Sequence, residues 1–338
     1  MKKIIITVAI ILVVLGIVIF GVAFALAGFS FKNLATGNYE EVSFDITSEF
    51  EGISVDTDTA DVIILPSEDG KSRVTAYQHK ELPHTAWVDG GVLRVEVNDR
   101  REWYNFINLF TPKENVKVYL PESYYKSLNI EVDTGDVLVP SDFTFGSIKV
   151  DSDTGDLRIG ASSEGEINVG TDTGDVEITS ASVGSLVIEG DTGDVNLDGT
   201  AVKADLRIEL ETGDAYLAEV TVEGSLNIEN DTGDVELKRV SAKGGIRCDT
   251  DTGDVSLVQT VAEGALRIET DTGDVELEGS DGKEIYITTS TGDVEGSILT
   301  EKVFITDSST GKIRVPSSTS GGRCEVRTST GDIILTIK

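Results

Sequence analysis

Residues 226–237, LNIENDTGDVEL, contain the pattern from which the fold of this 338-residue chain is predicted. An Asp-Thr-Gly-Asp tetrad separates two short runs in which apolar and polar residues alternate. Leu226 and Ile228 are the apolar residues before the tetrad, and Val235 and Leu237 are those after it. Alternation with a period of two on both sides of a turn predicts two short strands, each with one buried face.

The same pattern recurs along the chain from residue 133 onward, always after 19 or 20 residues. Thr-Gly is present in all eleven copies, and Asp follows the glycine in ten of them, with Lys312 as the exception. Glycine supplies the left-handed backbone that such a turn uses. The predicted turn glycines are Gly135, Gly155, Gly174, Gly193, Gly213, Gly233, Gly253, Gly273, Gly292, Gly311 and Gly331.

A period of about twenty residues predicts one coil of a stacked repeat per copy. One coil cannot bury its inner face alone, whereas coils stacked about 4.8 Å apart pair their backbones and share a core. A leucine-rich repeat of similar period would need a Leu-x-x-Leu-x-Leu signature, which is absent. The sequence therefore predicts an all-β, right-handed parallel β-helix, or β-solenoid, of about 11–12 coils.

The first part of the chain contains an apolar segment from Ile4 to Ala27 without a charged residue, preceded by Lys2 and Lys3. About 20 apolar residues span a bilayer, and the flanking lysines favour a cytoplasmic N-terminus. We therefore expect a single-pass cell-membrane protein whose C-terminal domain is extracellular, with the bilayer as a partner of residues 4–27. The alternative is a secretory signal cleaved after Ala25-Leu26-Ala27.

The predicted organisation has four parts. Residues 1–30 form an N-terminal transmembrane anchor, and residues 31–42 form a linker. Residues 43–132 form irregular N-terminal coils and a cap, and residues 133–338 form the regular Thr-Gly-Asp solenoid. Strands are expected at Val92–Val97 and Val116–Pro121, and the aromatic run Trp103–Phe110 is expected to cap the solenoid or to contact the membrane interface.

The chain carries 60 acidic and 28 basic residues, a formal net charge of −32. This charge excludes nucleic acid as a partner and favours cations or basic partners. Carboxylates after the turn glycines are expected to stack in a column that Lys312 interrupts, with repulsion of about 0.9 kcal/mol per neighbouring pair in bulk water. Ca²⁺ is an alternative occupant, and its candidate ligands are Asp136, Asp156, Asp175, Asp194, Asp214, Asp234, Asp254 and Asp274.

The Val-Tyr-Leu-Pro segment at 118–121, its continuation into Leu128-Asn129-Ile130, the apolar start and the repeated Thr-Gly-Asp turns resemble the bacterial putative-adhesin family. This family comprises cell-envelope β-solenoids, LiaG-like proteins among them. The resemblance covers about residues 43–338. It implies a location in the envelope, and it supplies no catalytic residue.

Asp-Thr-Gly is also the catalytic triplet of aspartic proteases, which place two such loops face to face. Seven copies at coil spacing would stack in one column instead, so turns are the better interpretation. His79 and His84 are interpreted as surface or cap residues. We expect no catalytic residue, no cofactor and no enzymatic activity.

Two cysteines, Cys248 and Cys324, occupy inward-facing positions of the repeat, four coils apart, and are expected to be free buried thiols. The function that these patterns favour is a non-catalytic, membrane-anchored structural or binding module of the bacterial cell envelope, adhesin-like or related to envelope stress. Its expected partners are an unknown envelope protein or glycan, or a second copy through the C-terminal edge at residues 333–337. The alternatives are a Ca²⁺-dependent binding protein and a glycan-active β-helix enzyme.

Overall fold

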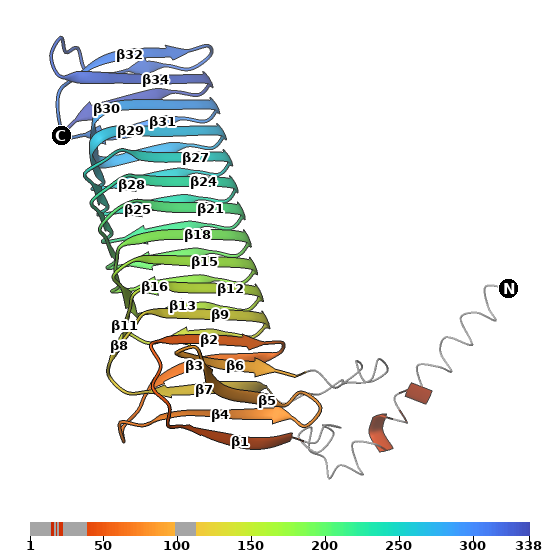
Figure 1. Ribbon diagram of the computed structural model, residues 1–338. Coiled ribbons are helices and arrows are strands. Elements are labelled where there is room, and N and C mark those ends of the chain that lie inside the picture. Colours follow the sequence, from red (N-terminus) through yellow and green to blue (C-terminus); the bar gives the residue numbers. More distant parts are fainter. Residues whose placement is uncertain (1–14, 17, 19, 23–38, 99–112) are drawn as a thin grey trace.

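The computed structural model describes residues 15, 16, 18, 20–22, 39–98 and 113–338. Residues 39–98 and 113–338 form a long, mainly parallel β-solenoid, with the first strands at one end and the last coils at the other (Figure 1). No helix among the described residues is long and apolar enough to cross a membrane. The predicted anchor, Ile4–Ala27, and the predicted capping run, Trp103–Phe110, lie wholly or largely outside the described residues. The right-handed winding stays a prediction.

Each regular coil contributes one strand to each of three rows. The strands that precede the turn form the row called here sheet B, and those that follow the turn form sheet A. In spatial order, sheet B consists of β6 (Val92–Val97), β2 (Gly52–Thr57), β9 (Ser127–Thr134), β12 (Ile148–Thr154), β15 (Glu166–Thr173), β18 (Ser185–Thr192), β21 (Leu206–Thr212), β24 (Leu226–Thr232), β27 (Ile246–Thr252), β29 (Val261–Thr272), β30 (Val275–Thr291), β34 (Gly322–Thr330) and β32 (Lys302–Ser308).

Sheet A follows the same order on the other side of the turn. It consists of β7 (Glu114–Leu120), β3 (Ala60–Pro66), β10 (Val137–Val139), β13 (Leu157–Ile159), β16 (Val176–Thr179), β19 (Val195–Asp198), β22 (Ala215–Ala218), β25 (Val235–Lys238), β28 (Val255–Val258), the first part of β30, β31 (Val294–Ile298), β35 (Ile333–Ile337) and β33 (Ile313–Arg314). A third row of two-residue strands comprises β8 (Tyr124–Tyr125), β11 (Thr144–Phe145), β14 (Ser162–Ser163), β17 (Ser182–Val183), β20 (Ala201–Val202), β23 (Thr221–Val222) and β26 (Ser241–Ala242).

The core consists of aliphatic rows that run along the solenoid axis. Leu206, Leu226 and Ile246 are directly paired in neighbouring strands, and each is at most 1% exposed. Val235 and Leu237, which follow the turn, are also fully buried. The predicted strands and their inward-facing positions are therefore confirmed, including β6 and β7 in the irregular part.

The order of coils in space differs from their order in the chain at both ends. At one end, β2 lies between β6 and β9, so the second coil of the chain is outside the first. At the other end, β34 lies between β30 and β32, and β35 lies between β31 and β33. The C-terminal strand Ile333–Ile337 is therefore not the last strand of the stack: β33 pairs with its first two residues, and β32 is the outermost strand of sheet B. Association of two copies through residues 333–337 stays a prediction.

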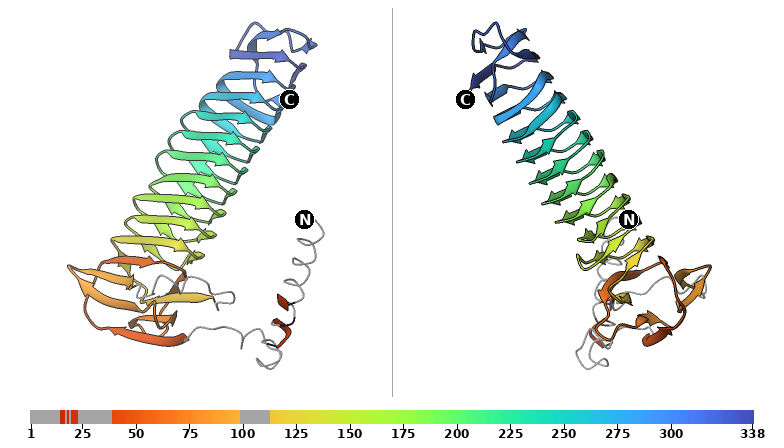
Figure 2. Two further views of the ribbon diagram at one scale, coloured as in Figure 1. Left: turned by 90° about the vertical axis from the view of Figure 1, so that its right-hand side faces the viewer. Right: turned by 60° about the vertical axis from the view of Figure 1, so that its left-hand side comes forward.

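The N-terminal end is covered by antiparallel strands. β5 (His84–Asp89) pairs with β6 on sheet B, whereas β4 (Ser72–His79) pairs with β7 on sheet A and with β1 (Tyr39–Ile46) on its other side. The two views of Figure 2 show this group of strands closing one end of the stack. β1 is the last strand of this cover.

Both cysteines are free and buried, as predicted. Burial raises the pKa of each thiol to about 12. Because β34 pairs directly with β30, three strand pairings separate them rather than the expected four. At coil spacing this is about 14 Å, which is still far beyond the reach of a disulfide.

His84, the first residue of β5 in the N-terminal cover, is buried and is held in its neutral form. Gln78 Oε1, which can only accept, receives both the His84 backbone N–H at 2.6 Å and His84 Nδ1–H at 3.1 Å. His84 Nε2 therefore accepts from the Thr57 hydroxyl at 2.9 Å. Burial lowers the pKa of His84 to about 4, whereas an unfolded histidine titrates near 6.5.

This lowered pKa predicts acid sensitivity of the N-terminal coils. The unfolded chain binds the extra proton first, so the stabilisation is complete above pH 6.5 and is lost as the pH falls towards 4. The loss amounts to about 3 kcal/mol at most. The test is denaturant unfolding at several pH values, followed by tryptophan fluorescence, because both tryptophans lie in this part of the chain. His84→Gln should flatten the profile between pH 6.5 and 4, and His79→Gln should not.

Candidate functional site: the acidic turn edge

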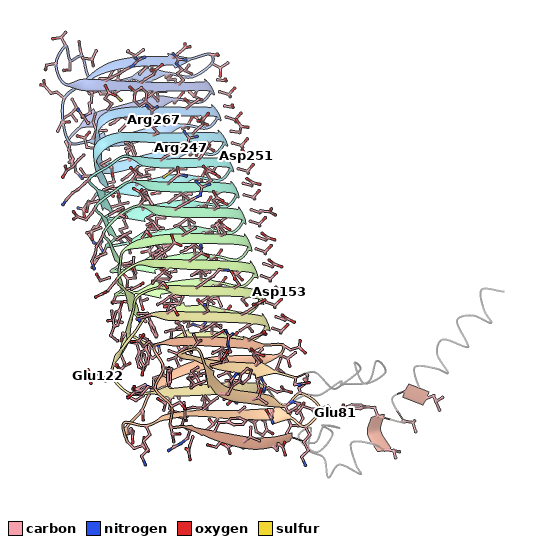
Figure 3. All side chains as sticks on the ribbon, viewed as in Figure 1. Glu81, Glu122, Asp153, Arg247, Asp251 and Arg267 are labelled. Carbon is pink, nitrogen blue, oxygen red and sulfur yellow. The ribbon has the colours of Figure 1, made fainter. Side chains whose placement is uncertain are left out.

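The Thr-Gly turns lie along one edge of the solenoid, where the strands of sheet B end. Asp153 and Asp251, which occupy the first position of two tetrads, both project from this edge (Figure 3). The structure thus aligns the turns as predicted. We call this edge the acidic turn edge, and it comprises three rows of residues: the first acid of each tetrad, the threonine, and the acid after the glycine.

The glycines of this edge are required by both conformation and space. Ten of the eleven turn glycines have φ angles between +140° and +158°, with +146° at Gly213, and residues with a side chain rarely adopt this backbone conformation. Gly311, in the outermost coil, has no positive φ. A Cβ on Gly213 would lie 1.9 Å from the carbonyl oxygen of Gly193 in the preceding coil. The expected left-handed turn is thus replaced by an extended backbone with positive φ. Close approach of successive turns is the second reason for glycine.

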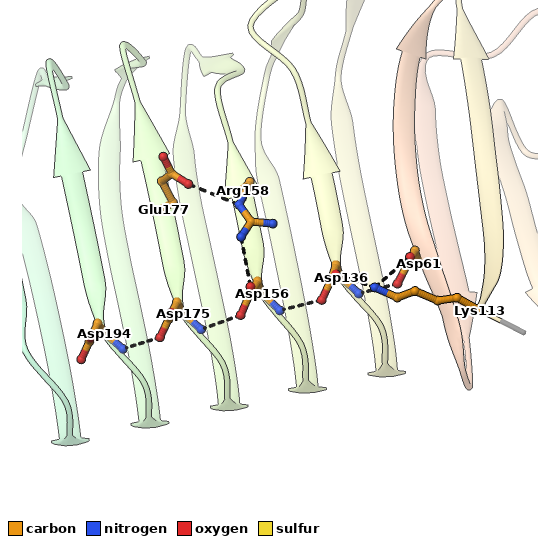
Figure 4. Close-up of polar contacts among 8 residues, drawn as sticks. All are labelled: Asp61, Lys113, Asp136, Asp156, Arg158, Asp175, Glu177 and Asp194. Atoms are coloured by element: carbon orange, nitrogen blue, oxygen red, sulfur yellow. Dashed lines mark hydrogen bonds and ion pairs between the residues drawn. The ribbon is translucent and has the colours of Figure 1, made fainter. Parts of the chain in front are cut away.

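The acids after the glycines form a hydrogen-bonded ladder along the axis. Asp175 Oδ1 accepts the backbone N–H of Asp194 at 3.0 Å (Figure 4). Asp194 Oδ1 in turn accepts the backbone N–H of Asp214 at 2.9 Å. The same bond repeats between coils with lengths of 2.7–3.3 Å. In spatial order the rungs are Asp61, Asp136, Asp156, Asp175, Asp194, Asp214, Asp234, Asp254, Asp274, Asp293, Asp332 and Lys312.

Lys312 ends this ladder and does not interrupt it, contrary to the sequence expectation. Its backbone N–H donates to Asp332 Oδ1 at 2.7 Å, and its coil is the outermost one. A side-chain acceptor at this position would have no further described coil to bind. The aspartates are therefore structural rungs, since each supplies an acceptor to the backbone of the next coil.

In the described part of the chain, lysine and arginine side chains form ion pairs with the ladder at its start only. Lys113 Nζ lies 3.2 Å from Asp61 Oδ2 and 2.7 Å from Asp136 Oδ2, and this contact lowers the pKa of Asp136. Arg158 contacts Asp156 at 3.0 Å (Figure 4). Among the described residues, no lysine or arginine forms an ion pair with the eight rungs from Asp175 to Asp332.

A second acidic row lies at the exposed first position of the tetrads. Burial, followed by the charges of Asp58 and Asp153, raises the pKa of Asp133. This row consists of Asp58, Asp133, Asp153, Asp172, Asp191, Glu211, Asp231, Asp251 and Asp271 and ends in Ser290, Ser329 and Ser309. The threonines between the two rows are exposed and pair with one another from coil to coil, as Thr212 does with Thr232.

The ladder predicts how substitutions of Asp214 change stability, because Asp214 Oδ1 accepts the backbone N–H of Asp234 at 2.8 Å. Asp214→Ala removes this acceptor and should cost about 1–2 kcal/mol. Asp214→Asn keeps an oxygen acceptor and removes one charge from the column, so its stability should equal or exceed that of the wild type at low salt. Chemical unfolding of the three proteins at low and high salt measures both effects. Equal losses in the two variants would contradict the ladder.

The predicted Ca²⁺ ligands are all placed on the ladder, one per coil, and not gathered around one point. Among the described residues, no group of three or more His, Cys, Asp or Glu side chains is arranged to hold a metal ion. Sequence reasoning did not anticipate that each carboxylate binds an amide of the next coil. The fixed spacing of 19 or 20 residues was the available signal, because it sets successive acids in register.

Fold and edge together define a class of protein: a repeat β-solenoid with a charged turn edge. Residues 50–256 and 224–338 match the profile of the Toastrack DUF4097 family, and the chain belongs to this family. No curated protein matches the chain.

Several solved structures are similar over most of their length. A putative adhesin from Parabacteroides merdae is 14% identical, with 78% of this chain and 97% of that chain covered and a TM-score of 0.43. A putative adhesin from Parabacteroides distasonis is 12% identical, with coverages of 87% and 98% and a TM-score of 0.40. A putative lipid binding protein from Parabacteroides distasonis is 15% identical, with coverages of 89% and 98% and a TM-score of 0.34.

Proposed function

We propose that this chain is a non-catalytic binding module of the bacterial cell envelope, anchored in the membrane by residues 4–27 and adhesin-like in its action. The acidic turn edge is its proposed contact surface, and a basic segment of an envelope protein is the proposed partner. The observation that carries this proposal is the run of eight ladder carboxylates without a cationic partner among the described residues.

The density of negative charge along the acidic turn edge supports a basic partner. Neighbouring coils lie about 4.8 Å apart, so two carboxylates per coil form a dense row of negative charge. Such a row attracts cationic groups at long range, and the attraction weakens with salt. The edge is also pre-organised, because one oxygen of each ladder carboxylate is fixed by a backbone N–H. A partner with lysines or arginines in an extended segment would match this spacing.

An enzymatic role has less support. Catalytic sites combine several different ionisable groups in one cleft, whereas this edge repeats one kind of group. The two ring nitrogens of His84, the buried histidine, form hydrogen bonds with Gln78 and Thr57. The location in the envelope is supported by the apolar segment Ile4–Ala27, the lysines before it and the family resemblance.

The test uses an extended oligolysine peptide as a probe of the full chain in detergent. In the edge variant, Asp172, Asp191 and Asp231 are replaced by Ser, the residue that the chain itself uses at this position in its last coils. The control variant replaces Glu219, Glu223 and Glu263 by Ser; these exposed residues follow the sheet A strands of their coils, and the variant has the same net charge. Binding that falls only in the edge variant supports the proposal, and equal loss in both contradicts it.

Calcium is tested in the same samples. A calorimetric titration with CaCl₂ that shows saturable uptake, together with a rise in melting temperature, would favour the Ca²⁺-dependent alternative. Crosslinking in cells, followed by identification of the captured molecule, then establishes whether the natural partner is a protein or a glycan.

A further inference from the structure

The two ends of the solenoid differ in what covers them. At one end, β1 is the outermost strand, and the side chains that it exposes are Glu41, Ser43 and Asp45. At the other end, β32 is the outermost strand of sheet B, and it exposes Val303, Ile305 and Asp307. Charged and polar side chains on edge strands prevent pairing with other chains. β1 has this protection, and β32 lacks most of it.

Exposed apolar side chains concentrate around β32. Val303 is 38% exposed, Ile305 44% and Ile313 41%. Leu299, which precedes this coil, is 44% exposed. Elsewhere in the described strands and turns from residue 39 onward, large exposed apolar residues are scattered singly. The same coil leaves Phe304 and Val315, which pack on the core, only partly buried.

The backbone of this coil is also open on one side. β32 pairs with β34, and β33 pairs with β35, and no described strand pairs with their opposite edges. A parallel solenoid directs its backbone hydrogen bonds along the axis, so this coil presents a row of unpaired N–H and C=O groups. The interior rows also end here without a cover among the described residues.

Charge makes this end the place where two copies of the chain repel each other least. Residues 301–338 contain six basic and four acidic side chains, a net charge of +2 in a chain of −32. In the outermost coil, Glu301 and Asp307 are balanced by Lys312 and Arg314, and all four are exposed. Lys302 is already paired with Asp281 at 2.7 Å in the interior. Contacts between the acidic bodies would carry a much larger electrostatic cost.

We propose that two copies of this chain associate end to end through β32, which pairs with β32 of the second copy in antiparallel orientation about a two-fold axis. Such an axis continues sheet B of one copy into sheet B of the other and brings the two open interiors together. An isologous contact of this kind closes at two copies, because each uses the same edge. The proposal concerns the free end of the solenoid and does not depend on the acidic turn edge or on the membrane anchor.

The test measures the mass of the full chain in detergent over a range of concentrations. The edge variant carries Val303→Lys and Ile305→Lys, which add charges of the kind that protect natural edge strands. The control variant carries Leu138→Lys and Val261→Lys, two substitutions at equally exposed positions in inner coils. We expect a concentration-dependent dimer whose association constant falls about tenfold or more in the edge variant and is unchanged in the control.

A second measurement separates this dimer from association through other parts of the chain. Ile305→Cys should give a disulfide-linked dimer under mild oxidation, whereas Ser43→Cys on β1 should not. Continued protection of the native thiols shows that each variant is folded, because Cys248 and Cys324 are buried. A monomer at every concentration, equal weakening in the edge and control variants, or crosslinking through residue 43 alone would overturn the proposal.

Discussion

Gly213→Ala is expected to destabilise the solenoid by about 3 kcal/mol or more, although it adds only one methyl group. The new Cβ would lie 1.9 Å from the carbonyl oxygen of Gly193, and φ at this residue is +146°. The contact is with backbone and not with a side chain that could rotate away. Relief therefore requires the coils to separate at this turn, which breaks ladder and sheet hydrogen bonds together.

The matched control is Gly170→Ala in β15. Gly170 has no positive φ, and the nearest atom to its added Cβ is a carboxylate oxygen of Asp151 at 3.1 Å, on a side chain that can move. We expect a change of less than about 1 kcal/mol there. Circular dichroism during chemical unfolding gives the loss, and hydrogen exchange in β18–β24 shows whether opening is local. A Gly213→Ala protein as stable as the control would show that successive turns do not approach as closely as the structure has them.

The second large effect is expected at Lys302, whose ammonium lies 2.7 Å from Asp281 Oδ1 with both side chains less than a tenth exposed. Thr300 donates its hydroxyl to Asp281 Oδ2 at 2.7 Å, and Lys302 also contacts that hydroxyl. Lys302→Met leaves Asp281 buried without a cationic partner. The expected cost is about 3–5 kcal/mol, because an unpaired buried charge is strongly unfavourable.

The control for this prediction is Lys243→Met, which breaks the exposed pair of Lys243 with Glu223. An exposed pair contributes less than about 1 kcal/mol. Since Lys302 begins the outermost strand of sheet B, the loss should concentrate in β32 and β34. Hydrogen exchange of peptides from 302–308 and 322–330 measures it. Uniform exchange along the solenoid, or a loss no larger than that of Lys243→Met, would contradict the role assigned to this pair.

The regular part of the fold could be predicted from the sequence because each coil repeats the same alternation of apolar and polar residues around a Thr-Gly turn. The alternation around each turn set the strands, and the fixed spacing set Leu226 over Leu206. The same register placed Cys248 and Cys324 in the interior. The period, the alternation and the positions of the glycines all favour the same structure. The strands and turns between residues 133 and 298 could therefore be predicted from the sequence.

The order of the end coils could not be predicted in this way. Phe304 and Cys324 occupy equivalent positions of the same template and are direct partners in the structure. Periodicity shows that two strands can lie in one row, and it does not show which of them is outermost. Two residues indicated which coil is outermost. Lys312 stands where all the remaining turns have aspartate, and Lys302 is a buried cation. Both break the repeat in the coil that ends the stack.

The site was predicted in outline and not in its bonding. Sequence alone aligned the aspartates and indicated repulsion between them. It did not indicate that Asp194 Oδ1 would accept the Asp214 N–H of the following coil. That bond depends on the distance between turns, and this distance follows from the close approach that the glycines allow.

Every rung of the ladder points in the same direction and makes the same hydrogen bond. The length of the solenoid can therefore change by whole coils. Deletion of residues 214–233 would join Gly213 to Asp234, and the chain would continue with the same turn and the same acceptor. Duplication of the same twenty residues would add one coil, again without a new kind of junction between coils. Solenoids of this type can therefore differ in length by multiples of about 4.8 Å while the N-terminal cover and the outermost coil stay the same.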